Sequence, residues 1–524
     1  MSLPAIRSEL HYGDRLVRCF AERPADIDAM VRAAVARAPA AVALVEGDKR
    51  ISYRELDAGI DAVAGNLARR GLAKGDRLAL LIGNRAEFVL ALLGAARIGV
   101  IVVPMNIRQR SAETEFVLQQ CAAAALIHDA ELAAQIPPRS RLPALRDIVV
   151  VGSEPQADTA FERLLTPAHP PRVEIAEEDV FCLLYTSGTT GRPKGAKLTH
   201  LGTVHSVLHY QYAMQLGPGE VSVLAVPASH VTGLVAIILS MLNVAGTIVM
   251  LPQFKAPRFL QLAASERMSY TLIVPAMYNL CLLEPDFARV DLSAWRTGGF
   301  GGAPMPPATI ARLAEALPGL TLLNIYGSTE TTSPCTLLPP GHIARHPDSV
   351  GLPLPCADVL IVDEAGRELP RGQSGELWIG GPMTVPGYWD NPEADATGFA
   401  AGYWRSGDIG SMDADGYVRV FDRKKDMINR GGFKVYCIEV ENVLSHHPGV
   451  IECAVVGVPD AVLGERVRAF VVPREPHPAA EELRSFCAER LSDYKVPEVV
   501  TFLDTPLPRN ANGKVVKTVL RDLK

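Results

Sequence analysis

Segments with helical and strand-like apolar patterns alternate along most of this chain of 524 residues. Apolar residues recur at helical spacing over residues 56–70, and a turn at 75–76 leads into an apolar run over 77–82. A second helical pattern over 87–98 precedes another apolar run over 100–104. Strands that alternate with helices across short turns predict an α/β fold with largely parallel sheets flanked by helices. Further apolar runs predict buried strands at 148–151, 180–184, 221–226, 247–251, 270–274 and 322–325.

The longest apolar stretch, residues 231–251, carries no charged side chain and is long enough to span a bilayer. Its interior contains glycine, serine, threonine and asparagine, and Pro252 follows it directly. We interpret this stretch as a buried helix, a glycine break and a buried strand. No integral membrane segment is therefore expected.

The pattern changes after about Gly351, where shorter β-like runs at 359–362, 375–379 and 417–421 are separated by Gly, Pro and Asp turns. These runs predict a small antiparallel, barrel-like β region. The highly charged stretch 422–426 follows, and charged linkers stay solvated, so we expect a domain boundary there. The remaining residues are enough for a small α+β domain.

Composition excludes several classes of protein. The 52 Lys and Arg residues against 58 Asp and Glu residues give a net charge of −6, and no basic stripe with interleaved aromatics indicates nucleic-acid binding. None of the nine cysteines forms a C-x-x-C pair, which argues against a zinc site or a disulfide scaffold. Reduced thiols and an N-terminus without an apolar core segment predict a cytoplasmic protein.

The segment YTSGTTGRPKG, residues 185–195, is the most specific motif in the chain. Glycines let backbone N–H groups turn toward an anion, hydroxyl groups add donors, and Lys194 adds a positive charge. These are the requirements of a loop that holds a polyphosphate. The segment does not match the common P-loop motif, because Pro193 stands where that motif needs its second glycine.

This segment resembles the signature of the adenylate-forming superfamily, which includes acyl-CoA synthetases, firefly luciferase and the adenylation domains of nonribosomal peptide synthetases. Four more segments match the family in order: NIYGSTE at 324–330, YWRSGD at 403–408, DRKKDMINRGGFKVYCIEVE at 422–441 and PRNANGK at 508–514. The resemblance covers nearly the whole chain. It implies activation of a carboxylic acid by ATP and Mg²⁺, followed by transfer of the acyl group to coenzyme A.

The resemblance also implies the roles of individual residues. The first loop would hold the β- and γ-phosphates of ATP through Thr186, Ser187, Gly188, Thr189, Thr190, Gly191 and Lys194. The second segment would line the nucleotide through Asn324, Tyr326, Gly327, Ser328 and Thr329, with Tyr326 beside the adenine and Thr329 at the α-phosphate. Glu330 would ligate Mg²⁺, and Asp408 and Arg423 would bind the ribose. Lys514 would bridge the substrate carboxylate and the α-phosphate, so the implied catalytic residues are Lys194, Thr329, Glu330 and Lys514.

In this family the C-terminal domain rotates about a hinge. The resemblance therefore implies an N-terminal domain over 1–422, a hinge over 423–425 centred on Lys425, and a mobile C-terminal domain over 426–524. One pose would deliver Lys514 for adenylation, and the other would present Gly431 and Gly432 for thioester formation. A single residue can absorb such a rotation through its φ and ψ angles.

The acid pocket is less well specified. The resemblance implies that His230 borders it and that Phe300, Gly301 and Gly302 form one wall. We find no clearly placed cation for a second substrate carboxylate, although Arg296 leaves that point open. The chain departs from the family at Asn429, where many aryl-activating members have lysine, and at Cys437, where proline is usual.

We therefore expect a carboxylic acid–CoA ligase that forms AMP and pyrophosphate, acting first on a medium- or long-chain fatty acid. An aromatic acid of the benzoate or cinnamate type is the alternative substrate. A second alternative is an enzyme that donates its acyl-adenylate to a carrier protein in trans, because the chain ends ten residues after Lys514. The expected partners are small molecules, and a homodimer is left open.

Overall fold

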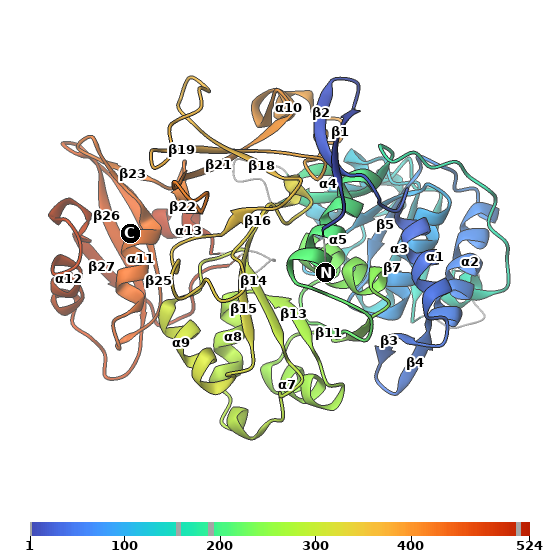
Figure 1. The fold of residues 1–524 in the computed structure, drawn as a ribbon, viewed down its shortest axis with the longest axis horizontal. Coiled ribbons are helices and arrows are strands. Elements are labelled where there is room, and N and C mark those ends of the chain that lie inside the picture. The colour runs from blue at the N-terminus through green and yellow to red at the C-terminus, as the bar shows by residue number, and fades with distance from the viewer. Residues whose placement is uncertain (1–2, 153–158, 187–192, 510–514, 524) are drawn as a thin grey trace.

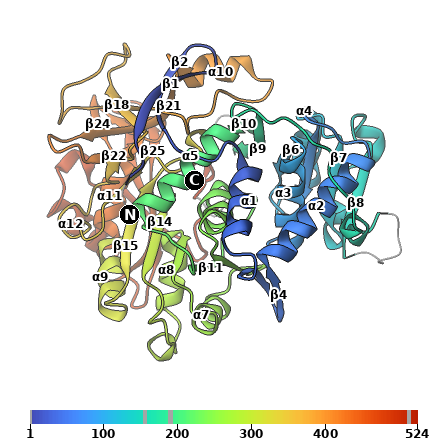
Figure 2. The same cartoon turned by 45° about the vertical axis from the view of Figure 1, so that its right-hand side comes forward.

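The computed structural model describes residues 3–152, 159–186, 193–509 and 515–523. Two large sheets form the bulk of the chain, a smaller antiparallel region lies beside them, and a fourth group of elements follows at the C-terminal end (Figure 1). The turned view separates the sheet of β5–β8 from the sheet that carries β11–β15 (Figure 2). The α/β fold with largely parallel sheets is confirmed.

The first large sheet has the strand order β10-β9-β6-β5-β7-β8 and is parallel except for the β9–β10 pair. Its strands are β5 (Arg77–Leu81), β6 (Ile101–Pro104), β7 (Ala125–Asp129), β8 (Asp147–Val151), β9 (Val180–Thr186) and β10 (Lys194–Thr199). Its helices are α2 (Tyr53–Arg69), α3 (Ala86–Arg97) and α4 (Ser111–Gln120). The predicted helices and strands of this region are confirmed within three residues at each end.

The second large sheet has the order β17-β16-β15-β14-β13-β11-β12-β3-β4, with parallel pairing from β15 to β3 and antiparallel pairs at both ends. Its strands are β3 (Val42–Glu46), β4 (Lys49–Ser52), β11 (Val221–Leu224), β12 (Thr247–Met250), β13 (Tyr270–Ile273), β14 (Thr297–Gly301), β15 (Thr321–Tyr326), β16 (Thr336–Leu337) and β17 (Leu352–Pro353). The accompanying helices are α1 (Ile27–Arg37), α5 (His200–Ala213), α7 (Ala256–Ser265), α8 (Pro275–Leu282) and α9 (Pro307–Ala316).

The long apolar stretch folds as the sequence predicts. It forms a π-helix over Thr232–Leu239, the short α6 (Ser240–Asn243) and then β12, with most of its side chains buried in the main apolar core. Within the described residues, every helix is too short or too polar to cross a membrane.

The antiparallel region consists of β18 (Asp358–Val362), β19 (Ser374–Gly380), β20 (Phe399–Ala400), β21 (Tyr403–Met412) and β22 (Val418–Arg423), together with α10 (Pro392–Gly398). The three β-like runs predicted here are confirmed. The C-terminal group has its own sheet and its own apolar clusters. It contains β23 (Ile428–Arg430), β24 (Phe433–Val435), α11 (Cys437–Ser445), β25 (Val450–Asp460), β26 (Gly464–Pro473), α12 (Ala480–Ala488), β27 (Val499–Phe502) and α13 (Lys517–Asp522).

The structure adds elements that the sequence did not predict. Strands β1 (Ile6–His11) and β2 (Arg15–Phe20) form a separate hairpin at the N-terminus. Strand β14 has the sequence TGGFG, whose glycines argue against a strand when they are considered alone. A side chain at Gly301 would place its Cβ 2.4 Å from the Ile325 carbonyl oxygen of the neighbouring strand, so glycine is required there.

Candidate active site

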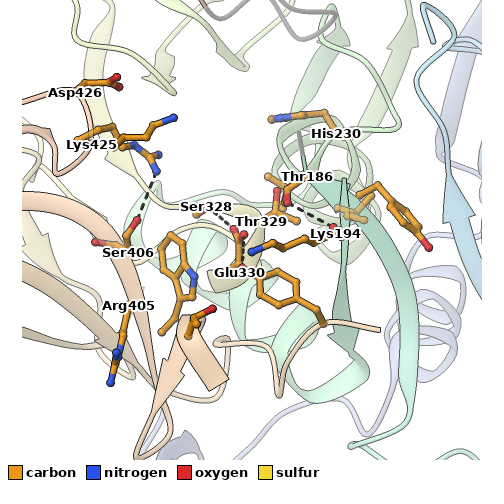
Figure 3. A pocket seen from close by; sticks show the side chains of 18 of the residues that line it. Thr186, Lys194, His230, Ser328, Thr329, Glu330, Arg405, Ser406, Lys425 and Asp426 are labelled. Carbon is orange, nitrogen blue, oxygen red and sulfur yellow. Dashed lines mark hydrogen bonds between the residues drawn. The ribbon is translucent and has the colours of Figure 1, made fainter. Parts of the chain in front are cut away.

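A cavity of about 700 Å³ lies where the two large sheets, the antiparallel region and the C-terminal group meet. Its lining comes from the ends of β9 and β10, the turn after β15, the residues between β22 and β23, and the start of α13. Figure 3 shows Thr186, Lys194, His230 and Glu330 on one side of this cavity and Lys425 and Asp426 on the other. Segments far apart in the sequence therefore contribute to one site.

The predicted phosphate-binding loop has both of its described ends at the cavity. Thr186 ends β9 and pairs with Lys194 at the start of β10, and the Thr186 hydroxyl donates to the Lys194 carbonyl oxygen at 3.4 Å. The Lys194 ammonium lies 5.2 Å from the centre of the Tyr388 ring. The predicted loop residues Ser187, Gly188, Thr189, Thr190 and Gly191 lie outside the described residues.

Glu330 is a buried carboxylate whose two oxygens each accept a hydrogen bond. It lies in the 3-10 turn Thr329–Thr331 after β15, and 7% of it is exposed. The Ser328 hydroxyl donates to one oxygen at 2.7 Å, and the Tyr388 hydroxyl donates to the other at 2.9 Å. Ser328, Thr329 and Glu330 all line the cavity. Because Mg²⁺ prefers oxygen ligands and is usually bound by one or two carboxylates together with substrate phosphates, this arrangement fits the predicted metal ligand.

Tyr388 is a site residue that the sequence analysis missed. It is 5% exposed and lines the cavity. Burial raises the pKa of its hydroxyl well above the usual range, and the neighbouring Glu330 carboxylate raises it further. Tyr388 therefore stays protonated and acts as a hydrogen-bond donor. Its position depends on a contact between segments 58 residues apart, for which the sequence has no local signal.

Asp408 and Arg423, which are predicted at the ribose, lie together with Tyr326, which is predicted beside the adenine. Asp408 on β21 is directly opposite Arg423 on β22, and Arg423 Nε lies 2.6 Å from Asp408 Oδ1. The Tyr326 hydroxyl at the end of β15 donates to Asp408 Oδ2 at 2.5 Å. Burial lowers the pKa of Arg423, but the acidic groups around it, of which Asp408 acts most strongly, together outweigh this effect and the net pKa is raised. Arg423 is 42% exposed and reaches the cavity wall.

Two other predicted nucleotide residues make their contacts outside the described cavity lining. The Asn324 side-chain amide donates to the Ser349 carbonyl oxygen at 2.9 Å. Gly327 packs so tightly that an added Cβ would lie 3.0 Å from Pro334 Cα. Neither residue lines the cavity that the structure describes, whereas Trp404, Arg405 and Ser406, from the predicted segment 403–408, do line it.

Of the four predicted acid-pocket residues, His230 lines the cavity together with its neighbours Ser229 and Val231. Phe300 is 2% exposed within the main apolar core, and Gly302 has φ of +77° just after β14. Phe300, Gly301 and Gly302 do not line the described cavity. Arg296, which had left room for a second substrate carboxylate, pairs with the Glu220 carboxylate at 2.7 Å.

The predicted hinge residue, Lys425, also lines the cavity. Burial lowers the pKa of its ammonium, and the neighbouring Arg423 and Arg521 act in the same direction, against Asp426. Arg521 on α13 binds the Asp426 carboxylate at 2.9 Å and the Lys425 carbonyl oxygen at 3.4 Å. The last helix of the chain is therefore tied to the residues between β22 and β23.

The C-terminal segment reaches the cavity through Val515, Val516, Lys517 and Thr518. Within this segment, Val516 N–H donates to the Pro508 carbonyl oxygen at 2.8 Å. Lys514 itself lies outside the described residues. Gly431 and Gly432 form the exposed turn between β23 and β24, with φ of +58° and +90°, and do not line the described cavity.

The two residues that depart from the family pattern, Cys437 and Asn429, both donate hydrogen bonds to neighbouring residues. Cys437 begins α11, where its N–H donates to the Asp422 carboxylate and its thiol donates to the Asp426 carbonyl oxygen at 3.0 Å. A proline at this position would have neither donor. Asn429 is exposed on β23, and its N–H donates to a Glu465 carboxylate oxygen at 2.7 Å.

Comparisons with known proteins find similarity over most of the chain. Residues 31–389 match the family described as AMP-binding enzyme, and residues 439–514 match the AMP-binding enzyme C-terminal domain. A feruloyl-CoA synthase from Amycolatopsis sp is 35% identical over 484 residues, covering 92% of this chain and 96% of that protein. The long-chain-fatty-acid–CoA ligase FadD13 of Mycobacterium tuberculosis is 34% identical over 484 residues, covering 91% of this chain and 93% of that protein.

Two solved structures are also similar. The ATP-bound MatB of Rhodopseudomonas palustris superimposes with a TM-score of 0.87 at 30% identity, covering 95% of this chain and 98% of that one. An anthranilate CoA ligase, AuaEII, in complex with anthranoyl-AMP, superimposes with a TM-score of 0.88 at 27% identity, covering 95% of this chain and 96% of that one.

Proposed function

The chain belongs to the AMP-binding enzyme family of acyl-CoA ligases, and on that premise we propose how its residues divide the reaction and which acid it takes. In the first step the acid attacks the α-phosphate of ATP, giving acyl-AMP and pyrophosphate. In the second step CoA attacks the acyl-adenylate, giving acyl-CoA and AMP. A carboxylate is a poor acyl donor because hydroxide leaves badly, and AMP is a far better leaving group.

One observation carries the division of roles. Lys194, Glu330 and Arg423 all line the cavity, and Arg423 is paired with Asp408. Attack of a carboxylate on ATP brings an anion toward a polyanion, so the site needs cations and oriented donors around the phosphates. We assign Lys194 and the loop 186–191 to the β- and γ-phosphates, Thr329 to the α-phosphate, and Asp408 with Arg423 to the ribose.

We assign Mg²⁺ to Glu330, whose carboxylate faces the cavity next to Thr329. A bound Mg²⁺ would neutralise charge on the phosphates as pyrophosphate leaves. Lys514 would deliver a further positive charge between the acid and the α-phosphate. The segment directly after it, residues 515–518, lines the cavity, and this supports the assignment. The boundary at 422–426 and the hinge at Lys425 are part of the same proposal, in which Gly431 and Gly432 reach the site in a second pose.

We propose a medium- or long-chain fatty acid as the substrate. The pairing of Arg296 with Glu220 supports an acid with a single carboxylate, because this arginine's charge is already balanced within the protein. An aromatic acid is the second candidate, and the 35% identity to a feruloyl-CoA synthase favours it. The nine cysteines, all described and all free thiols, support a cytoplasmic location.

The experiment that tests the proposal measures pyrophosphate release with ATP and Mg²⁺ over a panel of fatty and aromatic acids, each with and without CoA. A preferred fatty acid, with acyl-CoA and AMP appearing together, supports the first proposal. A preferred aromatic acid replaces the substrate class but keeps the reaction. An acyl-adenylate that CoA does not discharge would indicate a carrier protein as the acceptor. Light scattering on the same preparation would distinguish a monomer from a homodimer.

A further inference from the structure

Tyr388 lies between β10, which begins with Lys194, and the turn that carries Glu330. It forms a bridge to Ala196 on β10, and its neighbour Trp389 donates its N–H to the Gly195 carbonyl oxygen at 2.7 Å. The Tyr388 N–H donates to an Asp395 carboxylate oxygen at 2.6 Å. Its backbone is therefore fixed to the strand that begins with Lys194 and to α10.

The same short segment is also tied to the turn that carries Glu330. Val385 N–H donates to the Glu330 carbonyl oxygen at 2.9 Å. On its outer side, the Arg15 guanidinium donates to the carbonyl oxygens of Val385 and Pro386 at 3.2 and 3.1 Å. Residues 385–389 thus connect β10 with the Glu330 turn through backbone contacts on both sides.

The Tyr388 side chain also contacts the charged groups of both segments. Its hydroxyl donates to Glu330 Oε1 at 2.9 Å, while the Lys194 ammonium lies 5.2 Å from its ring centre. Figure 3 shows the Lys194 and Glu330 side chains close together at the cavity. Within the described residues no ion pair of 4.0 Å or less joins these two opposite charges. A direct pair would occupy both groups and remove them from the phosphates and the metal.

Tyr388 can hold the Lys194 ammonium and the Glu330 carboxylate in place without neutralising either charge. The face of an aromatic ring attracts a cation without neutralising it. A hydroxyl that donates to one oxygen of a carboxylate fixes its orientation and leaves further lone pairs on both oxygens for a metal. The Ser328 hydroxyl holds the other oxygen at 2.7 Å in the same way. The carboxylate is therefore oriented from two sides.

We infer that Tyr388 is a positioning residue, whose hydroxyl orients the Glu330 carboxylate for Mg²⁺ and whose ring holds Lys194 beside it for the ATP phosphates. This inference rests on the proposed function, because it takes Glu330 as the metal ligand. It predicts that the hydroxyl and the ring have separable effects. Loss of the hydroxyl should weaken the contribution of Mg²⁺ to ATP binding, whereas loss of the ring should also weaken binding of ATP without metal.

Isothermal titration calorimetry with ATP, in the absence of any acid, tests this on the full chain. Each protein is titrated once with Mg²⁺ and once with EDTA. In Tyr388→Phe the affinity for Mg²⁺-ATP should fall about 10-fold, the usual scale for losing a group that orients a metal ligand, while the affinity for metal-free ATP stays within about 2-fold. In Tyr388→Leu both affinities should fall.

Tyr53→Phe is the matched control, because it removes a buried hydroxyl that donates to the Gly246 carbonyl oxygen at 2.7 Å, outside the described cavity lining. It should change neither affinity. The inference is overturned if Tyr388→Phe binds Mg²⁺-ATP as the wild type does, or if it loses both affinities equally. A wild-type protein whose ATP affinity ignores Mg²⁺ would overturn the metal role proposed for Glu330, and the inference with it.

Discussion

Asp408 and Arg423 face each other across two antiparallel strands, and Arg423 Nε lies 2.6 Å from Asp408 Oδ1. The other carboxylate oxygen accepts a hydrogen bond from the Tyr326 hydroxyl. The Asp408 side chain is 5% exposed, so it is a buried charge whose orientation is fixed by a cation and a hydroxyl. This order should exist before a nucleotide binds, because all three groups belong to the folded chain.

Asp408→Asn should therefore weaken nucleotide binding strongly. The change keeps the shape of the side chain but removes its charge, and Arg423 loses its ionic partner. A hydrogen bond to a charged group contributes about 1.5–3 kcal/mol, which predicts a roughly 10- to 150-fold higher dissociation constant for AMP in calorimetry. Asp358→Asn is the matched control, since Asp358 accepts from the Tyr403 hydroxyl in the same β region and has no predicted role at the nucleotide. Equal AMP affinity in both variants would contradict the ribose assignment.

The alternation of helices and strands could be predicted because it depends on local apolar periodicity. Strand β14 could not, because Gly298, Gly299 and Gly301 have weak strand preference, and their need for glycine arises from close neighbours. A Cβ at Gly299, for example, would lie 2.8 Å from a side-chain atom of Ile325. Such a constraint exists only once the strands are assembled.

The same distinction holds at the site. Thr186, Lys194, Glu330, Asp408 and Arg423 lie in segments with their own sequence signal, and the structure brings their segments together. Tyr388 and the two hydrogen bonds of Cys437 depend on tertiary contacts, so no single segment predicts them.

Lys514→Ala should slow the first half-reaction. Losing one preorganised positive charge at the reacting phosphate predicts at least a 100-fold decrease in the rate of acid-dependent pyrophosphate release. Thioester formation from supplied acyl-adenylate and CoA should be largely unchanged, because the α-phosphate is no longer attacked in that step. Lys49→Ala, at an exposed lysine on β4, is the control for loss of a positive charge. A parallel loss of both half-reactions would argue against a role specific to adenylation.

Lys425→Pro should have the opposite effect. Proline fixes φ near −65° and so restricts the backbone rotation that a change of pose requires. We expect thioester formation from supplied acyl-adenylate to fall at least 10-fold, while pyrophosphate release in the first turnover changes much less. Lys425→Ala removes the same side chain but leaves the backbone free, so it should retain thioester formation. If the alanine and proline variants behave alike, the side chain rather than a hinge accounts for the effect.

Helix α5 carries three buried histidines whose protonation opposes folding. Burial lowers the pKa of His200 and His205 to about 4 and that of His209 to about 3. His205 accepts a hydrogen bond from Phe20 N–H at 3.2 Å, whereas neither ring nitrogen of His209 has a partner within the described residues. An unfolded histidine titrates near 6.5, so the stability that these groups contribute is complete above pH 6.5 and is lost as the pH falls toward their folded pKa values.

His209→Leu should therefore make the protein less sensitive to acid. The His209 ring packs against Phe20 and makes no hydrogen bond within the described residues, so leucine can replace it without losing one. The free energy of unfolding at pH 7.5 should therefore change by less than about 1 kcal/mol. Between pH 7.5 and pH 5, the free energy of unfolding of the wild type should fall by about 2 kcal/mol more than that of the variant. The estimate follows because a neutral buried histidine costs about 1.36 kcal/mol for each pH unit below 6.5. Urea unfolding at the two pH values measures this difference, with the exposed His169→Gln as control. An unchanged pH dependence in His209→Leu would show that His209 does not remain neutral in the folded protein.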